Sequence, residues 1–442
     1  MLFKTSPRLR RFIYTAFAFC LAGFAAARAG AQGQSAFDRM MELNRSGQWD
    51  EAARLAEEFL AAAAAKPRAE VCQARWSLAY SQARLAREAD ALTSLAAYDR
   101  DCKGLPASAS WLDREVARLR AELRPRTAAP PVRDDGFWRS AEPRMVGVRP
   151  DALAEHRELC MRSAADACLV IRKGRIVQEF YSPRYRTPMM AMSSTKSVTG
   201  LLVGMLFDDG RIKSIDDPVC KYVPEWCSGR RGKVTIRHLL SMTSGLPRMF
   251  EDGVGYASDK NAFVVGLEPS AEPGTAWAYS NEGVQLLSPL LDKAAGEPIQ
   301  DYARRRLFGP LGMRETRLHL DPKGHAWTYA DMETTARDFA RLGLLMLGGG
   351  VWEGKRIVSR EWVEQSTKPS QTFAPYYGLL WWLVESPRGY AAVGNLDTNL
   401  YVFPEEELVV VRMQSKPKEG AASYSREAPA LFKKFVERAD AR

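Results

Sequence analysis

The chain has 442 residues, of which 46% are hydrophobic and 26% charged. This composition is typical of a globular protein and excludes a disordered chain. Because the length exceeds what one hydrophobic core usually serves, we expect a large domain and a smaller one. The net charge is +10, and removing the five cations that precede residue 32 leaves +5. No basic run or aromatic-interleaved basic patch accompanies this mild excess, so we expect no nucleic-acid partner.

Residues 1–31 have the features of a secretory signal peptide. A basic start is followed by an apolar stretch at 12–27 and by the small residues 29–31, which suit a cleavage site. The apolar stretch is shorter than the roughly 20 residues that span a bilayer, so we expect cleavage and no stable membrane anchor afterwards. The sequence therefore predicts a periplasmic or secreted protein.

Six cysteines remain after this cleavage, and they fall into three local pairs. An even number of cysteines in an oxidising compartment indicates disulfides, although sequence alone leaves the connectivity open. Free buried cysteines are the alternative. The three local pairs are Cys72 and Cys102, Cys160 and Cys168, and Cys220 and Cys227.

Residues 32–124 are predicted to form a small all-α segment. Two amphipathic runs with similar starts, at 47–53 and 87–92, lie about 40 residues apart. The segment weakly resembles a tetratricopeptide-like helical hairpin, but two imperfect copies fall short of the three repeats such arrays need. It either binds a protein partner or packs as a plain helical bundle. The proline-rich stretch 125–135 is the predicted linker.

Residues 136–442 are predicted to form one α+β domain. Residues 167–181 have the pattern of a β-hairpin, and a long helical middle follows. Two strands are expected at 400–403 and 408–413, with a closing helix at 429–439. This order predicts an antiparallel sheet built from the domain's termini, with an all-helical lobe inserted between them.

The first candidate for chemistry is Ser193-Ser194-Thr195-Lys196, directly before an apolar helical run. Residues i and i+3 share one face of a helix, so the Lys196 amine can reach the Ser193 hydroxyl. A serine becomes a useful nucleophile when an adjacent base takes its proton, and a buried lysine can serve. The motif also occurs at 415–418, where a proline interrupts the helix, and we interpret that copy as accidental.

The second candidate is Tyr279-Ser280-Asn281. A tyrosine beside a lysine can relay a proton to the serine or to a leaving group. An asparagine amide offers both a donor and an acceptor to a substrate ester or amide. The alternative for Tyr279 is a packed tyrosine with a satisfied hydroxyl.

These motifs, in this order and with 238–246 between them, resemble the penicillin-recognising serine hydrolases. Within that family the chain is most similar to the class C β-lactamase-related branch, which includes esterases and 6-aminohexanoate-dimer hydrolases. The likeness covers about residues 136–440 and includes 334–343. It implies a β-lactamase/transpeptidase-like fold, with Ser193 as nucleophile, Lys196 as general base, Tyr279 as proton relay and Asn281 as a substrate contact.

The resemblance weakens near the C-terminus. The family carries a Lys-Thr-Gly or His-x-Gly motif on its last active-site strand, and neither occurs in this chain. Matching 394–398 to that strand places Asn395 at the cationic position and the backbone N–H of Thr398 at the oxyanion hole. Asp397 replaces the usual glycine, and we expect it to repel a substrate carboxylate. The family's handle for such a carboxylate is therefore missing.

The leading hypothesis is a hydrolase of small ester or amide substrates that works without a cofactor. The alternatives are a β-lactamase or D,D-peptidase acting on cell-wall-like substrates, and a non-catalytic periplasmic interaction protein. The histidines lack ligand spacing, so no metal is expected, and His238 is interpreted as structural. Four aromatic residues form either an apolar acyl pocket or core: Tyr376, Tyr377, Trp381 and Trp382.

Overall fold

The computed structural model divides the chain into two compact units, Met1–Pro125 and Arg126–Arg442. It describes residues 35–45, 48–85, 87–102, 110–123, 136–183, 185, 187–247, 253–418 and 420–435. The predicted signal peptide and linker lie outside these residues, and both stay predictions. No helix in the described ranges is long and apolar enough to cross a membrane.

The first unit is helical, as expected. Its helices are α2 (Ala36–Arg45), α3 (Trp49–Ala61), α4 (Arg68–Arg84), α5 (Glu88–Cys102) and α6 (Ser110–Leu123). Helix α4 is the centre, because it contacts the other four and buries side chains around most of its circumference. A disulfide between Cys72 and Cys102 joins α4 to α5. The tetratricopeptide-like interpretation stays a prediction.

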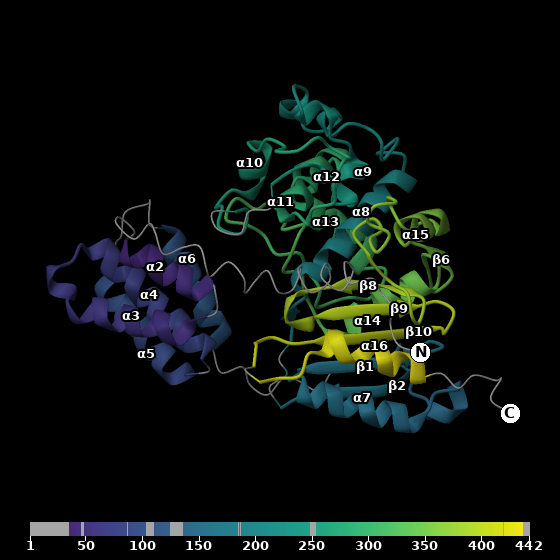
Figure 1. The fold of residues 1–442 in the computed structure, drawn as a ribbon, viewed down its shortest axis with the longest axis horizontal. Helices are drawn as coiled ribbons and strands as arrows, with labels where there is room; N and C mark the ends of the chain where they lie inside the picture. The colour runs from purple at the N-terminus through teal and green to yellow at the C-terminus, as the bar shows by residue number, and fades with distance from the viewer. Residues whose placement is uncertain are drawn as a thin grey trace. The chain divides into compact units, whose positions relative to one another are not determined.

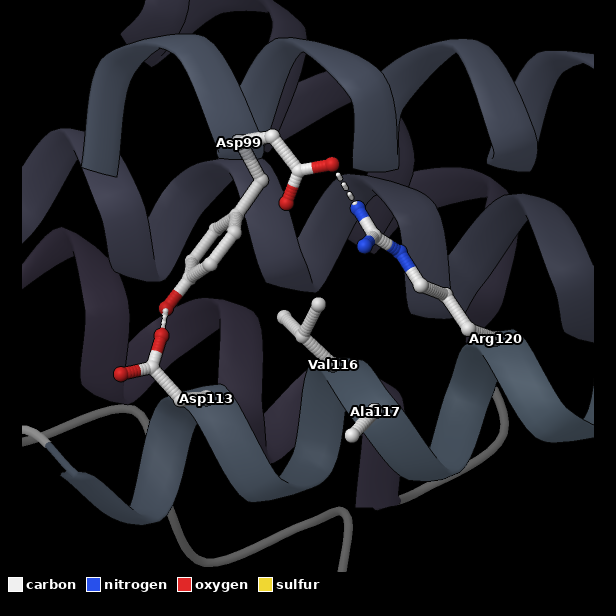
Figure 2. A pocket seen from close by; sticks show the side chains of 6 residues that line it. Asp99, Asp113, Val116, Ala117 and Arg120 are labelled. Carbon is white, nitrogen blue, oxygen red and sulfur yellow. Dashed lines mark hydrogen bonds and ion pairs between the residues drawn. The ribbon is translucent and has the colours of Figure 1, made fainter. Parts of the chain in front are cut away.

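A pocket opens between α5 and α6 of this unit (Figure 2). The Tyr98 hydroxyl donates to Asp113 at 2.7 Å, and Arg120 pairs with Asp99 across the opening. Burial and the neighbouring Asp113 raise the pKa of Tyr98, so this hydroxyl stays protonated. The polar lining groups are therefore largely engaged with one another.

The second unit contains a six-stranded antiparallel sheet with the order β2-β1-β10-β9-β8-β7. Its strands are β1 (Ala167–Arg172), β2 (Arg175–Tyr181), β7 (Trp382–Val384), β8 (Gly389–Val393), β9 (Asn399–Phe403) and β10 (Leu408–Met413). The β1–β2 hairpin comes from the start of the unit and the other four strands from its end. The predicted sheet built from the domain's termini is confirmed.

Both faces of the central strands are covered (Figure 1). Because side chains alternate along a strand, Cys168 and Val170 face α7 (Pro150–Arg162) and α16 (Tyr424–Phe435). Leu169 and Ile171 belong to the larger core on the other face, which includes α14 (Ala336–Leu347) and α8 (Thr195–Asp208). A disulfide between Cys160 and Cys168 fixes α7 to β1.

The helical lobe lies between β2 and β7 in the sequence, as expected. Besides α8 and α14 it contains α9 (Ile236–Leu240), α10 (Lys260–Val265), α11 (Asn281–Gln285), α12 (Leu287–Ala295), α13 (Ile299–Ala303) and α15 (Arg360–Ser366). Two short two-stranded pairs complete the unit: β3 (Met189–Met190) with β4 (Glu333–Thr334), and β5 (Val351–Trp352) with β6 (Lys355–Arg356).

Two sequence expectations need correction. The closing helix was expected at 429–439, yet α16 begins at Tyr424 and contains Pro429 in its interior. The third cysteine pair forms no disulfide in the structure, where the Cys227 thiol donates to the Cys220 carbonyl at 3.5 Å. The carboxylate of Asp397, which lies far from α16 in the sequence, caps the start of this helix.

The buried His156 on α7 should make the stability of the fold depend on pH. Its fully buried ring bonds the Tyr424 hydroxyl at 2.6 Å and the Gln178 amide at 2.8 Å. Burial lowers the pKa of His156 from 6.5 to about 4. The unfolded chain therefore binds a proton that the folded chain excludes, so stability present above pH 6.5 is lost as the pH falls toward about 4.

We expect this loss to reach about 3 kcal/mol in the wild type. In His156→Gln, which can still bond Tyr424 but does not titrate, the decline in this pH range should be much shallower. Urea unfolding at pH values between about 7.5 and about 4.5 measures it. Equal pH slopes for the two proteins would contradict the assignment.

Candidate active site

Ser193 lies on a 3₁₀ turn, Met192–Ser194, that leads directly into α8. The preceding residue, Met192, has a φ of +50°, in the left-handed region that non-glycine residues rarely adopt. The Met332 carbonyl accepts from the Ala191 N–H at 2.7 Å, and the Met192 carbonyl accepts from the Asp331 N–H at 3.2 Å. Backbone strain of this kind persists only where the surroundings enforce it, and it is concentrated at functional sites.

Helix α8 is a rigid support for Ser193. Every residue from Thr195 to Leu206 is buried, so the polar side chains of this stretch need internal partners. Ser197 donates to the Leu380 carbonyl and Thr199 to the Thr328 carbonyl. At Gly204, an added Cβ would lie only 2.3 Å from the Trp362 indole, so this close helix contact requires glycine.

The Lys196 amine is fixed beside the serine. Lys196 is 2% exposed, and its Nζ donates to the Ser193 Oγ at 3.1 Å. The same Nζ donates to Asn281 Oδ1 at 2.8 Å and to the Tyr329 carbonyl at 2.7 Å. All three of these acceptors are uncharged oxygens from separate segments of the chain. The structure thus brings Ser193, Lys196 and Asn281 into one hydrogen-bonded group.

Tyr279 lies beside this group, with its ring centre 4.8 Å from the Lys196 Nζ. The next residue, Ser280, caps α11 by accepting from the Gly283 N–H at 3.0 Å. The Ala278 N–H donates to the Met242 carbonyl at 2.8 Å, which holds the chain on the other side of Tyr279. The cap also places Asn281 at the first position of α11, where its amide faces Lys196.

The segment 238–246 forms the scaffold of the Tyr279 loop. His238 completes a capping box at the start of α9, where its Nδ1 accepts from the Thr235 N–H at 3.2 Å. The structural interpretation of His238 therefore holds. Gly245 has a φ of +73°, and an added Cβ would lie 2.3 Å from the Ala271 carbonyl. Only glycine allows this approach of the 270–274 chain that leads to Tyr279.

The turn after β8 contains Asn395 and Thr398. The Asn395 side chain is exposed and accepts from the Leu396 N–H at 2.9 Å. Thr398 is buried, and its N–H donates to the Asn395 carbonyl at 3.2 Å. The Thr398 carbonyl accepts from the Ser194 hydroxyl at 2.6 Å, which ties this turn to the residue after Ser193. Their roles as substrate contacts stay predictions.

Asp397 has a structural role that the sequence did not suggest. Its carboxylate accepts from the N–H groups of Tyr424 and Ser425, at 3.0 and 3.3 Å, and from the Ser425 hydroxyl. These are the first residues of α16, where unpaired N–H groups and the helix dipole favour an anion. Asp397 therefore caps α16 from a distant part of the chain, and its expected effect on a substrate carboxylate stays a prediction.

Aromatic side chains gather on one side of Tyr279. Its ring stacks on Trp382 with centroids 6.2 Å apart, and Trp382 also contacts Trp277 and Tyr376. These four residues are half-buried. Tyr377 and Trp381 are only 1% exposed. Tyr377 and Trp381 are therefore core, whereas Tyr376 and Trp382 form a partly open wall beside Tyr279, and a role of that wall as an acyl pocket stays a prediction.

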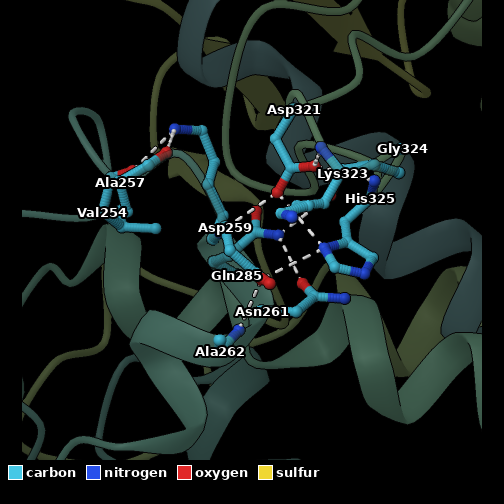
Figure 3. Close-up of polar contacts among 12 residues, drawn as sticks. Val254, Ala257, Asp259, Asn261, Ala262, Gln285, Asp321, Lys323, Gly324 and His325 are labelled. Carbon is cyan, nitrogen blue, oxygen red and sulfur yellow. Dashed lines mark hydrogen bonds and ion pairs between the residues drawn. The ribbon is translucent and has the colours of Figure 1, made fainter. Parts of the chain in front are cut away.

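Sequence reasoning missed a polar cluster of Asp259, Asp321 and His325 (Figure 3). His325 Nδ1 lies 3.3 Å from a carboxylate oxygen of each aspartate. Asp259 caps α10 through the Ala262 N–H, and Asp321 accepts from the backbone N–H of Lys260. The only local signal was the Asp321-x-x-x-His325 spacing. Both carboxylates are engaged with protein groups, and the cluster joins α10 to residues 321–325.

The site has a serine hydrogen-bonded to a buried lysine, with a tyrosine beside them, and the serine lies just before a helix in a unit that combines an antiparallel sheet with a helical lobe. These features are those of a serine hydrolase. The chain belongs to the β-lactamase family, whose model, described as Beta-lactamase, matches residues 160–431.

Known relatives agree with this assignment. The chain is 28% identical to the 6-aminohexanoate-dimer hydrolase of Paenarthrobacter ureafaciens, over 73% of this chain and 91% of that protein. It is 27% identical to esterase EstB of Burkholderia gladioli, over 43% of this chain and 52% of EstB. A shorter match, 35% identical to penicillin-binding protein 4* of Bacillus subtilis, covers 29% of this chain and 30% of that protein.

Solved structures confirm the fold. A penicillin-binding protein homologue from Caulobacter crescentus matches with a TM-score of 0.53 and 18% identity, over 65% of this chain and 97% of that chain. The octameric penicillin-binding protein homologue from Pyrococcus abyssi matches with a TM-score of 0.50 and 20% identity, over 64% and 75% of the two chains. At these identities the likeness describes the fold alone.

Proposed function

We propose that this protein hydrolyses small, uncharged esters or amides through an acyl-enzyme on Ser193. The observation that carries the proposal is the hydrogen bond of 3.1 Å between the buried Lys196 Nζ and the Ser193 Oγ. The similarity to a 6-aminohexanoate-dimer hydrolase and to an esterase supports the choice of amide and ester bonds.

In the proposed acylation step, the neutral Lys196 amine takes the Ser193 proton while Oγ forms a bond to the substrate carbonyl carbon. The carbonyl oxygen becomes an oxyanion, and the tetrahedral intermediate collapses by breaking the bond to the leaving group. Tyr279 passes a proton to that leaving group, and Lys196 replenishes Tyr279. Water then attacks the acyl carbon while the Lys196 amine takes one of its protons. The second tetrahedral intermediate collapses by breaking the bond to Ser193 Oγ, which takes that proton back as the acid product leaves.

The proposed oxyanion donors are the backbone N–H groups of Ser193 and Thr398. The Thr398 N–H donates to the Asn395 carbonyl at 3.2 Å, so substrate binding has to replace this bond. Asn281 holds Lys196 and is the proposed contact for the substrate amide or ester group. Asn395 is exposed on the same turn as Thr398 and provides a neutral contact in place of a cation.

We also propose that the chain is exported and loses residues 1–31, which makes it periplasmic or secreted. The disulfides Cys72–Cys102 and Cys160–Cys168 support this proposal, because such bonds persist mainly in oxidising compartments. The helical unit is a candidate surface for a protein partner.

Labelling with a fluorophosphonate should modify Ser193. Ser193→Ala should lose the label, whereas Ser415→Ala should label like the wild type. Ser415 is the matched control because it occupies the second Ser-x-x-Lys copy, where its hydroxyl donates to Asp166 at 2.7 Å. Peptide mapping of the adduct measures the outcome, and an adduct on any other serine would overturn the proposal.

Lys196→Arg should lower kcat by about a hundredfold or more, because a guanidinium stays protonated and cannot act as a base. Lys418→Arg, in the exposed second copy of the motif, should leave kcat unchanged. Initial rates with p-nitrophenyl butyrate test this. Turnover near the wild-type level in Lys196→Arg would require Tyr279 to act as the base alone.

The wild type should hydrolyse p-nitrophenyl butyrate far better than nitrocefin, which bears a carboxylate. A hydrogen bond from a cation to that carboxylate is worth about 1.5–3 kcal/mol, against about 1 for a neutral donor. Asn395→Lys should therefore shift the ratio of kcat/KM values toward nitrocefin by about tenfold, whereas Asn395→Gln should not. Efficient nitrocefin turnover by the wild type would favour the β-lactamase alternative.

A further inference from the structure

The turn after β8 packs directly against the backbone that presents Ser193. An added Cβ on Gly394 would lie 2.7 Å from the Ala191 carbonyl and 3.1 Å from the Met192 side chain. The Ser194 hydroxyl donates to the Thr398 carbonyl at 2.6 Å. A displacement of residues 394–398 would therefore also displace the backbone next to Ser193.

This turn is strained at two consecutive positions. Leu396 has a φ of +60° and Asp397 a φ of +54°, and both carry a Cβ that disfavours the left-handed region. Glycine adopts this conformation without such a penalty. A strained turn without glycine keeps its shape only when surrounding contacts enforce it.

Two charged side chains supply those contacts. The Arg412 guanidinium is 1% exposed and donates to the carbonyls of both strained residues, at 3.1 Å in the case of Asp397. Its other amino group donates to the Ser163 carbonyl at 2.5 Å and to Gln414 Oε1 at 2.7 Å, so the guanidinium itself cannot shift. Asp397 in turn anchors the turn to the first N–H groups of α16.

Gln414 extends this network to Thr398. The Gln414 N–H donates to the Thr398 hydroxyl at 3.3 Å, and Arg412 holds the Gln414 side chain. The backbone N–H of Thr398 is the proposed oxyanion donor. The contacts of Arg412 and Asp397 therefore all help to fix where the Thr398 N–H lies relative to Ser193.

We propose that Arg412 and Asp397 are positioning residues that hold the oxyanion turn 394–398 in its left-handed conformation and couple it to α16. Neither residue touches the substrate, and both act through the backbone of the turn. The inference rests on the proposed function, because it concerns the oxyanion donor of the same acylation step.

The sharpest test compares Asp397→Ala with Asp397→Gly. Both variants lose the contact with α16, but only glycine accepts the left-handed conformation without strain. With p-nitrophenyl butyrate, Asp397→Ala should lower kcat by about tenfold or more with KM within about twofold, since loss of one oxyanion donor costs 10²–10³. Asp397→Gly should retain at least about threefold more kcat than Asp397→Ala.

Arg412→Met and Arg341→Met form the second comparison. Arg341 is also buried and also donates to two backbone carbonyls, those of Leu311 and Gly312, but it contacts no residue of the turn in these bonds. Arg412→Met should lower kcat by about tenfold or more, and adding Leu396→Gly to it should restore part of the loss. Arg341→Met should leave the kcat of the folded fraction unchanged.

Equal kcat values for the Ala and Gly variants of Asp397, both well below wild type, would mean that Asp397 acts only as a helix cap. That result would overturn the proposal. Wild-type kcat in folded Arg412→Met would also overturn it. If Arg412→Met does not fold, the Asp397 pair decides alone. Failure of the wild type to be labelled on Ser193 would instead refute the proposed function, so the two failures are distinguishable.

Discussion

The site depends on three hydrogen bonds made by the buried Lys196 amine. Lys196 bonds Ser193, Asn281 and the Tyr329 carbonyl, which lie on the turn before α8, at the start of α11 and on the chain before β4. A buried amine without these hydrogen-bond partners would carry a desolvation penalty, so the three segments have to converge on it. The same bonds that satisfy the buried amine bring it to the serine hydroxyl.

This convergence requires a stable structural support, which the sheet and α8 provide. The central strands are covered on both faces, so their backbone positions are fixed by packing on α7 and α16 on one side and on α14 on the other. Helix α8 is buried from Thr195 to Leu206 and makes a close contact with Trp362 at Gly204. The reactive groups therefore project from elements with little freedom to move.

Backbone strain is concentrated in the two segments that lie beside Ser193. Met192, Leu396 and Asp397 all have left-handed backbone conformations without being glycine, and they lie on the two segments that meet beside Ser193. At each position nearby hydrogen bonds compensate the cost. Asp397, at the position where the resemblance predicts a glycine, caps α16, which a glycine could not do because it has no side-chain acceptor.

The sequence by itself determined the sheet built from the two ends of the second unit, the helical lobe, and the Ser193–Lys196 and Tyr279–Asn281 motifs, because strand alternation and helical spacing are local patterns. It could not determine the Tyr329 carbonyl as a ligand of Lys196, since a backbone acceptor leaves no trace in residue type. It also could not reveal that Asp397 caps α16 or that Asp259, Asp321 and His325 meet. These contacts join residues distant in sequence, so only the tertiary structure, by bringing their segments together, decided which charges are satisfied and where they point.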